Sequence, residues 1–203
     1  VLGKLEAKVA ALPEGDTAVS ETVTDVVPAI RQMLSRSGRG FKTLKVTKNA
    51  LVDYFIEGNF KMIAKPFTPD IIVYCKSSYI FIEAESDEEI LKQAEEEIEA
   101  FVSGKGYTPK VLLIKGIGLI AVGDSSRNAQ IITDVFTDAM KVAFYAQSFG
   151  GEHPMERAWI DFIDNWEVEN YRRKVASSAS KGRVEGRTII VTGAAQGFGE
   201  GIA

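Results

Sequence analysis

The stretch that decides the fold prediction lies near the end of the sequence and reads Thr188-Ile189-Ile190-Val191-Thr192-Gly193-Ala194-Ala195-Gln196-Gly197-Phe198-Gly199. It begins with a short β-branched run, which is typical of a buried strand. The run continues into a turn with glycine at three closely spaced positions, where the backbone can bend tightly and approach another group closely. We therefore expect a strand, a loop and the start of a helix over residues 187–203.

This order of elements predicts the opening βα step of a Rossmann domain, in which the turn approaches a dinucleotide diphosphate. Such a domain needs a crossover of about a dozen residues before its next parallel strand, and roughly 100 residues in all. The 203-residue sequence ends four residues after Gly199. We therefore expect residues 187–203 to be the truncated start of a second domain in a larger protein. The small, polar and basic segment 177–186 has the composition of a linker, so residues 1–176 are expected to form the first domain.

The segment from Thr192 to Gly199 resembles the cofactor-binding fingerprint of the short-chain dehydrogenase/reductase family. The resemblance implies NAD or NADP as the cofactor of the parent protein. It also implies that the acidic residue that binds the ribose, and the catalytic Ser, Tyr and Lys, lie beyond Ala203. No catalytic residue is therefore expected in this chain, and the chain alone is not expected to bind the cofactor. The cofactor-binding candidates in this sequence are Gly193, Gln196, Gly197, Phe198 and Gly199.

The first domain alternates strand and helix patterns, which predicts an α/β fold. Two strands close together in the sequence, 110–114 and 119–122, are expected to pair as a hairpin, so the sheet should be mixed or largely antiparallel. A helix is expected to start at Ser86 with a capping box and another to be capped by Asp124. Further strands are expected at 41–46, 71–75 and 79–83, and further helices at 19–35, 49–55 and 159–177.

Residues 115–123, Lys-Gly-Ile-Gly-Leu-Ile-Ala-Val-Gly, followed by a long helix, resemble the end of a class II aldolase/adducin domain. In that family the turn reads Gly-His-Gly and its histidine binds zinc, whereas this sequence has Ile117. The segment Phe67-Thr68-Pro69-Asp70 is similar to the Thr-Pro-Asp-His segment of two-domain aldolase/dehydrogenase fusion proteins of the rhamnulose-1-phosphate aldolase/alcohol dehydrogenase type. That resemblance covers roughly residues 30–203 and implies that residues 1–176 are the later half of a layered α/β/α domain. No metal site is expected in this chain.

Taken with the glycine turn, the resemblance implies a bifunctional, NAD(P)-dependent oxidoreductase of carbohydrate metabolism that acts on a sugar, a sugar phosphate or a small aldehyde or alcohol. The dehydrogenase domain of the same polypeptide would be its main partner, and homo-oligomers are plausible for aldolase-like folds. Because Ile117 replaces the metal ligand, the alternative is a non-catalytic assembly or substrate-docking module.

The composition restricts the protein class. The sequence has a net charge of −4, 45% hydrophobic residues, one cysteine and one histidine. These values argue against a nucleic-acid partner and against a multi-histidine zinc site. No run is long enough to span a membrane and no internal disulfide is possible, so a cytoplasmic setting is expected. Cys75 is expected to be a buried, inert thiol and His153 to lie in a loop.

Two further sets of residues have structural interpretations that outweigh functional ones. Trp159, Phe162 and Trp166 recur at helical spacing, which indicates packing in the core or between domains rather than a substrate platform. Arg36, Arg39 and Lys42 flank a glycine turn and could contact a sugar phosphate, but surface charges around a turn are common.

Overall fold

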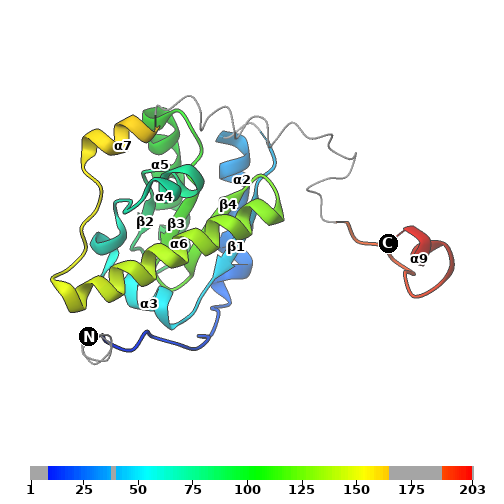
Figure 1. Ribbon diagram of the computed structural model, residues 1–203. Coiled ribbons are helices and arrows are strands. Elements are labelled where there is room, and N and C mark those ends of the chain that lie inside the picture. Colours follow the sequence, from blue (N-terminus) through cyan, green and yellow to red (C-terminus); the bar gives the residue numbers. More distant parts are fainter. Residues whose placement is uncertain (1–8, 38–39, 165–188, 203) are drawn as a thin grey trace.

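The computed structural model describes residues 9–37, 40–164 and 189–202. Within them the chain forms an α/β domain and, near the end of the sequence, a short helix (Figure 1). The elements in chain order are α2 (Thr22–Ser37), β1 (Thr43–Thr47), α3 (Ala50–Ile56), η1 (Phe60–Ile63), α4 (Pro69–Cys75), β2 (Ile80–Ile82), α5 (Asp87–Lys105), β3 (Val111–Ile114), β4 (Gly118–Gly123), α6 (Ser126–Ala146), η2 (Gln147–Phe149), α7 (Arg157–Asp164) and α9 (Gly197–Ile202).

The described strands form one mixed sheet in the order β1-β4-β3-β2. The predicted hairpin is confirmed, because β3 and β4 are antiparallel and joined by a tight turn. β1 is also antiparallel to β4, with Thr43 opposite Gly123 and Thr47 opposite Leu119. β2 is parallel to β3, and α5 makes the crossover that such a pair requires. The strand directions define two ends of the sheet. β1, β2 and β3 begin at the end where β4 stops, and all three stop at the end where β4 begins.

Helices cover both faces of this sheet. Alternate residues of a strand point to opposite faces, so Val111 and Leu113 of β3 pack with α3, α4 and α6. Leu112 and Ile114 pack on the other face with α2 and α5. Because β3 and β4 are buried on both faces, they read as continuous apolar runs rather than as alternating patterns. The expected layered α/β/α architecture is therefore confirmed (Figure 1).

The largest difference from the sequence prediction is at residues 71–75, which form the end of helix α4 and not a strand. The Thr68 hydroxyl accepts a hydrogen bond from the Ile71 amide at 3.4 Å, and Pro69 occupies the first turn, where its missing N–H is harmless. These start signals outweigh the β propensity of a short apolar run. The helix expected at 19–35 is present as α2, with Pro28 inside it.

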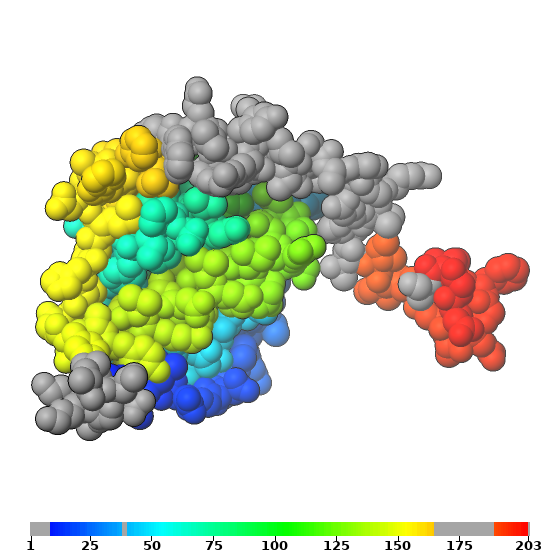
Figure 2. All heavy atoms as spheres, in the orientation of Figure 1, coloured from blue at the N-terminus to red at the C-terminus, as the bar shows by residue number. Residues whose placement is uncertain are grey.

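The helix after β4 is capped one residue later than expected. The side chain of Ser125, and not that of Asp124, accepts the hydrogen bond from the Asn128 amide at 3.2 Å. From there α6 runs across the face of the molecule that Figure 2 shows in light green, with the segment leading into α7 along one side in yellow.

The aromatic residues of α7 do not pack as predicted. Ile160 and Ile163 are buried against α4, whereas Trp159 and Phe162 are 61% and 56% exposed. Of the two alternatives predicted for these side chains, packing in the core is wrong, because the helix turns its branched aliphatic face inward. Packing between domains stays a prediction. Trp166 and the proposed linker 177–186 lie outside the described residues.

Candidate functional site

The glycine segment near the end of the sequence forms a turn that only glycine fits. Gly193 and Gly197 have φ values of 68° and 65°, in the left-handed region that side chains rarely adopt. A Cβ atom added to Gly199 would collide with the carbonyl group of Gly193. The turn thus folds back on the first residues of α9. Backbone conformation disfavours a side chain at Gly193 and Gly197, and contact with Gly193 excludes one at Gly199.

The expected strand before this turn is not present in residues 189–191, which have no regular structure. A strand forms only when another strand pairs with its N–H and C=O groups, and no strand pairs with these residues in the described parts of the chain. Ile190 is 89% exposed and Phe198 is 94% exposed. The five cofactor-binding candidates all lie within this turn and helix, and their role in binding stays a proposal.

The turn between β3 and β4 holds Ile117, the residue that the sequence resemblance aligns with a zinc-binding histidine. Ile117 lies at its tip, but its side chain is only 1% exposed and joins the core between the sheet, α2 and α5. Gly118 has a φ of 124°, and a Cβ atom there would lie 2.5 Å from the Thr47 carbonyl oxygen. The turn therefore packs tightly against β1, with an aliphatic residue where a ligand is expected.

The charged groups near this turn neutralise one another. The Lys115 ammonium donates a hydrogen bond to a Glu85 carboxylate oxygen at 2.5 Å. This hydrogen bond and the lysine charge lower the pKa of Glu85, and the same pair raises the pKa of Lys115. Among the described residues, no three His, Cys, Asp or Glu side chains gather in a way that could hold a metal ion. The side chains present here do not fit a zinc site, since an aliphatic side chain offers no ligand atom.

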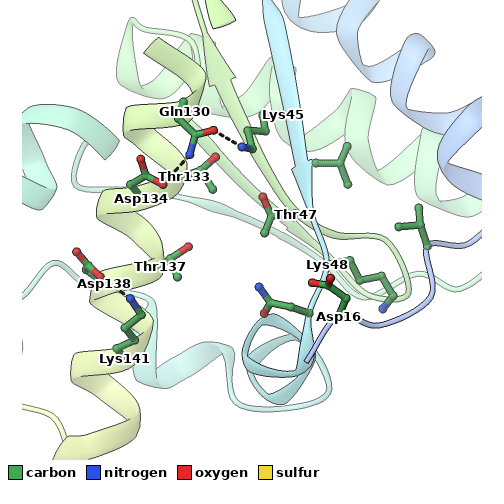
Figure 3. A pocket seen from close by; sticks show the side chains of 13 residues that line it. Asp16, Lys45, Thr47, Lys48, Gln130, Thr133, Asp134, Thr137, Asp138 and Lys141 are labelled. Carbon is green, nitrogen blue, oxygen red and sulfur yellow. Dashed lines mark hydrogen bonds and ion pairs between the residues drawn. The ribbon is translucent and has the colours of Figure 1, made fainter. Parts of the chain in front are cut away.

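A groove of about 660 Å³ lies between β1 and α6 (Figure 3). Gln130 bridges the two elements: its carbonyl oxygen accepts a hydrogen bond from Lys45, and its amide donates one to Asp134 at 2.7 Å. Lys141 and Asp138 form an ion pair at 2.9 Å one turn further along α6. Positive and negative side chains therefore balance along this wall.

Three threonines also line the groove. The Thr47 hydroxyl oxygen is buried and has no hydrogen-bond partner among the described residues. Thr137 lines the opposite wall, and the Thr133 hydroxyl donates to the Ala129 carbonyl oxygen at 2.9 Å. An unpaired buried hydroxyl is costly, and a ligand would pair with Thr47 only after the groove opened toward its covered oxygen. The chemistry of the groove suits a neutral, hydroxyl-rich molecule.

Cysteine and histidine side chains often act in catalysis, but Cys75 and His153 are not placed for it. Burial raises the pKa of the Cys75 thiol to about 12, and the sulfur donates a hydrogen bond to the Ile132 carbonyl oxygen. A thiol that stays protonated is a poor nucleophile, so the prediction of an inert buried cysteine is confirmed. His153 is exposed in the loop before α7, also as predicted.

The sequence matches the family Aldolase class II, second domain, over residues 21–172. The chain belongs to this family. The match covers the whole described α/β domain, and so it agrees with the layered fold and with the hairpin at residues 111–123. No curated protein matches the chain.

The chain is similar in fold to solved structures of YgbL. YgbL from Klebsiella pneumoniae, for which an aldolase, epimerase or decarboxylase activity is proposed, aligns with a TM-score of 0.50 and 11% identity. The alignment covers 68% of this chain and 64% of the YgbL chain, so the chain spans less than two thirds of that protein. YgbL from Escherichia coli aligns with a TM-score of 0.49 and 14% identity, over 69% of this chain and 65% of that chain. At these identities the likeness concerns the fold alone.

The groove between β1 and α6 could not be predicted from the sequence. Thr47 and Gln130 come from segments 83 residues apart, and neither lies in a motif. Only the register of β1 against β4, and the packing of α6 on both, bring them together. No helix of the described residues is long and apolar enough to cross a membrane.

Proposed function

We propose that this aldolase class II domain belongs to a bifunctional oxidoreductase, in which a short-chain dehydrogenase domain begins at residue 187 and uses NAD or NADP. The observation that carries the proposal is the geometry of the glycine segment. Three glycines stand at the three positions where a side chain is excluded by backbone conformation or by contact. A cradle of backbone that carries no side chains is what close approach to a diphosphate requires.

The residues that would hold the cofactor are Gly193, Gln196, Gly197, Phe198 and Gly199. When bound, a nicotinamide cofactor supplies hydride transfer to or from a carbonyl carbon. The part of this chain is to present backbone N–H groups to the phosphates and to keep side chains out of their way. The chain supplies no acid or base for the transfer in this proposal.

The aldolase-like domain would contribute the substrate side. Its groove between β1 and α6 has balanced charges and an unpaired buried hydroxyl at Thr47. Such a wall pairs well with the hydroxyl groups of a sugar or a small hydroxyaldehyde, since each polar group placed there finds a donor or an acceptor. We place the sugar-like substrate of the parent protein in this groove.

One observation favours a second function, that of a non-catalytic docking or assembly module. The aldolase-type ligand position is filled by buried Ile117, while Trp159 and Phe162 are exposed side by side on α7 with their rings 6.4 Å apart. Exposed aromatic pairs are enriched where proteins meet. Cofactor binding separates the two functions, because a docking module needs none.

The test uses the polypeptide encoded by the whole reading frame that contains these residues, titrated with NADH and followed by nicotinamide fluorescence. Gly199→Ala should weaken NADH binding by about tenfold or more, since forcing a side chain into such a turn costs about 1–3 kcal/mol. Gly201→Ala is the matched control in the same helix, because a Cβ atom there meets nothing within 4 Å. Equal affinities for the two variants would refute the assignment of the cradle.

A further inference from the structure

The described sheet has a free edge at β1, which pairs only with β4. In an antiparallel pair, every second residue directs its backbone N–H and C=O groups away from the partner strand. Val122, which lies opposite Leu44, donates its amide to the Lys110 carbonyl oxygen on the β3 side, at 2.9 Å. Leu44 therefore directs its backbone groups outward, and by the same alternation so does Val46. An added strand can pair with such outward groups.

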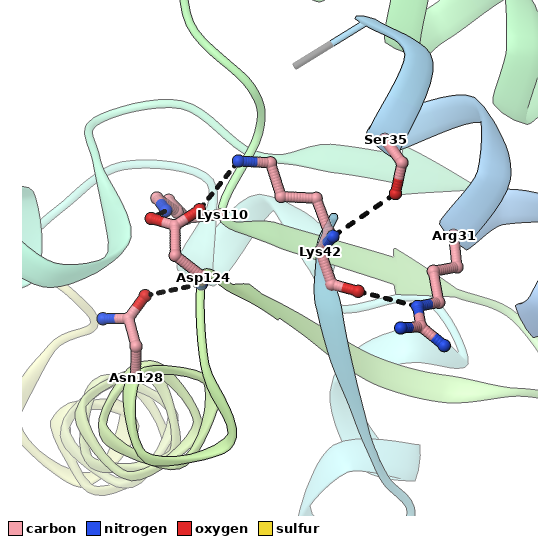
Figure 4. A network of polar contacts seen from close by, with 6 residues as sticks. All are labelled: Arg31, Ser35, Lys42, Lys110, Asp124 and Asn128. Atoms are coloured by element: carbon pink, nitrogen blue, oxygen red, sulfur yellow. Dashed lines mark hydrogen bonds and ion pairs between the residues drawn. The ribbon is translucent and has the colours of Figure 1, made fainter. Parts of the chain in front are cut away.

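Contacts occupy both ends of this edge and leave its middle open. At the start of β1, the Lys42 carbonyl oxygen accepts a hydrogen bond from Arg31 at 2.7 Å, and the Lys42 amide donates to the Ser35 hydroxyl at 3.3 Å (Figure 4). Beyond the end of β1, Asn49 forms an isolated antiparallel bridge with Asp16. Between these contacts, no hydrogen bond from the described residues reaches the outward backbone groups of β1.

The bridge fixes the register in which the segment before α2 would continue along β1. Antiparallel strands run in opposite directions, so the residue three positions after Asp16 lies opposite the residue three positions before Asn49. This register places Val19 opposite Val46. The residue that meets the outward backbone groups of Val46 is therefore Val19.

The hydrogen-bonding pattern selects the same partner. The Ala50 amide donates to the Gly15 carbonyl oxygen at 3.0 Å, so these two residues form a hydrogen-bonded pair directly beside the bridge. Such pairs recur at every second residue, which makes Val19 and Val46 a hydrogen-bonded pair too. Register and hydrogen-bonding pattern are separate observations, and both bring the N–H and C=O groups of Val19 to those of Val46.

The structure shows this pair before it has formed. Residues 17–20 have no regular structure, and Val19 is 58% exposed. Val19 and Val46 both line the groove between β1 and α6. Beyond them, the carbonyl oxygens of Ser20 and Glu21 accept backbone amides of α2 at 3.1 and 2.9 Å. The segment is therefore anchored at the bridge and at α2, and only its middle is unattached to β1.

We propose that residues 17–19 form a strap that pairs with β1 as an added strand and thereby changes one wall of the groove. Side chains alternate between the faces of a sheet, so Val19 would join Val46 on the face that α2 and α5 cover. Ala18 would then replace Val19 in the wall that faces α6. A ligand in the groove shares this wall with the strap, so its binding and the pairing are coupled.

A fixed loop makes a different prediction from a strap. If residues 17–20 only connect the bridge to α2, the Val46 amide has one environment, and changes in the segment do not alter it. If the strap pairs, the Val19 N–H donates to the Val46 carbonyl oxygen, whereas the Ala18 N–H points away from β1. Proline removes an N–H without adding a charge, so proline at these two adjacent positions should give opposite results.

The experiment measures nitrogen relaxation dispersion by NMR on the isotope-labelled chain, which detects a minor conformer that exchanges in microseconds to milliseconds. We expect exchange at the amides of Val19 and Val46 with one common rate. Val19→Pro should abolish the exchange at Val46, and the matched control Ala18→Pro should leave it as in wild type. Both positions are exposed and outside regular elements, so both variants should keep the wild-type Tm. Absence of exchange at Val46 in wild type, or equal effects of the two variants, would overturn the proposal.

Disulfide trapping tests the register without proline. Val19→Cys combined with Val46→Cys should crosslink under mild oxidation, because the Cα atoms of a hydrogen-bonded pair lie about 5.5 Å apart, within disulfide range. Ala18→Cys combined with Val46→Cys is the control, since these two side chains point to opposite faces in the proposed register. The first pair should crosslink about fivefold faster or more, and equal rates would contradict the register. Cys75 is buried and does not compete.

Titration of the same labelled chain with D-ribose separates the strap from the proposed substrate. The pairing of the strap with β1 depends only on the contacts above, whereas its coupling to a sugar rests on the proposed function. Ribose in the groove should shift the amide resonances of Val46 and Gln130, which both line it. Unchanged resonances beside intact exchange at Val46 would exclude the sugar from the groove and leave the strap in place.

Discussion

Gly118 is a residue at which the fold does not tolerate a side chain. Its φ of 124° is strained for any other residue, and an added Cβ atom would lie 2.5 Å from the Thr47 carbonyl oxygen of the neighbouring strand. Both effects act on backbone atoms, which cannot move aside without breaking the pairing of β1 with β4.

Gly118→Ala should therefore lower the free energy of unfolding by about 2 kcal/mol or more. Urea denaturation followed by circular dichroism measures the change. Gly104→Ala in α5 is the control, because a Cβ atom there is unobstructed and alanine favours a helix by up to about 1 kcal/mol. A Gly118→Ala protein as stable as wild type would mean that the hairpin turn is not packed as described.

Some of these residues could be predicted from the sequence and others could not. Glycine spacing made the turns at 116–118 and 193–199 predictable, since only a few conformations need glycine. The same argument cannot find Lys76, which is the only described non-glycine residue with a positive φ, because nothing in its neighbours indicates a left-handed lysine. The unpaired hydroxyl of Thr47 could not be predicted either, since it becomes a buried group only when β1 is covered.

At the scale of elements, the long helices followed from periodicity and capping, and the short helix expected at 49–55 is confirmed as α3, whereas α4 was not predicted. The capping box predicted for α5 is supported by the Ser86 hydroxyl, which accepts from the Glu89 amide at 3.3 Å. In contrast, the apolar run 71–75 satisfied strand and helix patterns equally, and the Thr68-Pro69 start decided for the helix. Asp124 and Ser125 are both good capping residues, so only the structure could show which one caps α6.

This difference gives a test at the start of α6. Ser125→Ala removes the side-chain acceptor for the Asn128 amide and should cost about 1 kcal/mol of unfolding free energy. Chemical denaturation of the variant measures it. Ser103→Ala, an exposed position inside α5, should be neutral or slightly stabilising. If Ser125→Ala were also neutral, the cap would have to be assigned to another group.

At the scale of the whole molecule, the sequence predicted the layers but not the arrangement of strands within them. Alternating strand and helix patterns give an α/β fold, and apolar runs on both faces require helices on both sides. The order β1-β4-β3-β2, with one parallel pair at its edge, depends on which strand β1 pairs with. No local pattern encodes that choice, yet the pairing of β1 with β4 is what places β1 beside α6 and forms the groove between them.

The central proposal also concerns the whole molecule. It is that this aldolase class II domain is joined to an NAD(P)-dependent dehydrogenase through the glycine segment at residues 193–199. The most direct measurement compares NADH oxidation by the polypeptide of the whole reading frame with that of residues 1–203 alone, using a panel of small sugars and aldehydes. The account predicts turnover above a protein-free blank for the longer polypeptide and none for residues 1–203. Turnover by residues 1–203, or a reading frame that ends at Ala203 and neither binds nor oxidises NADH, would contradict it.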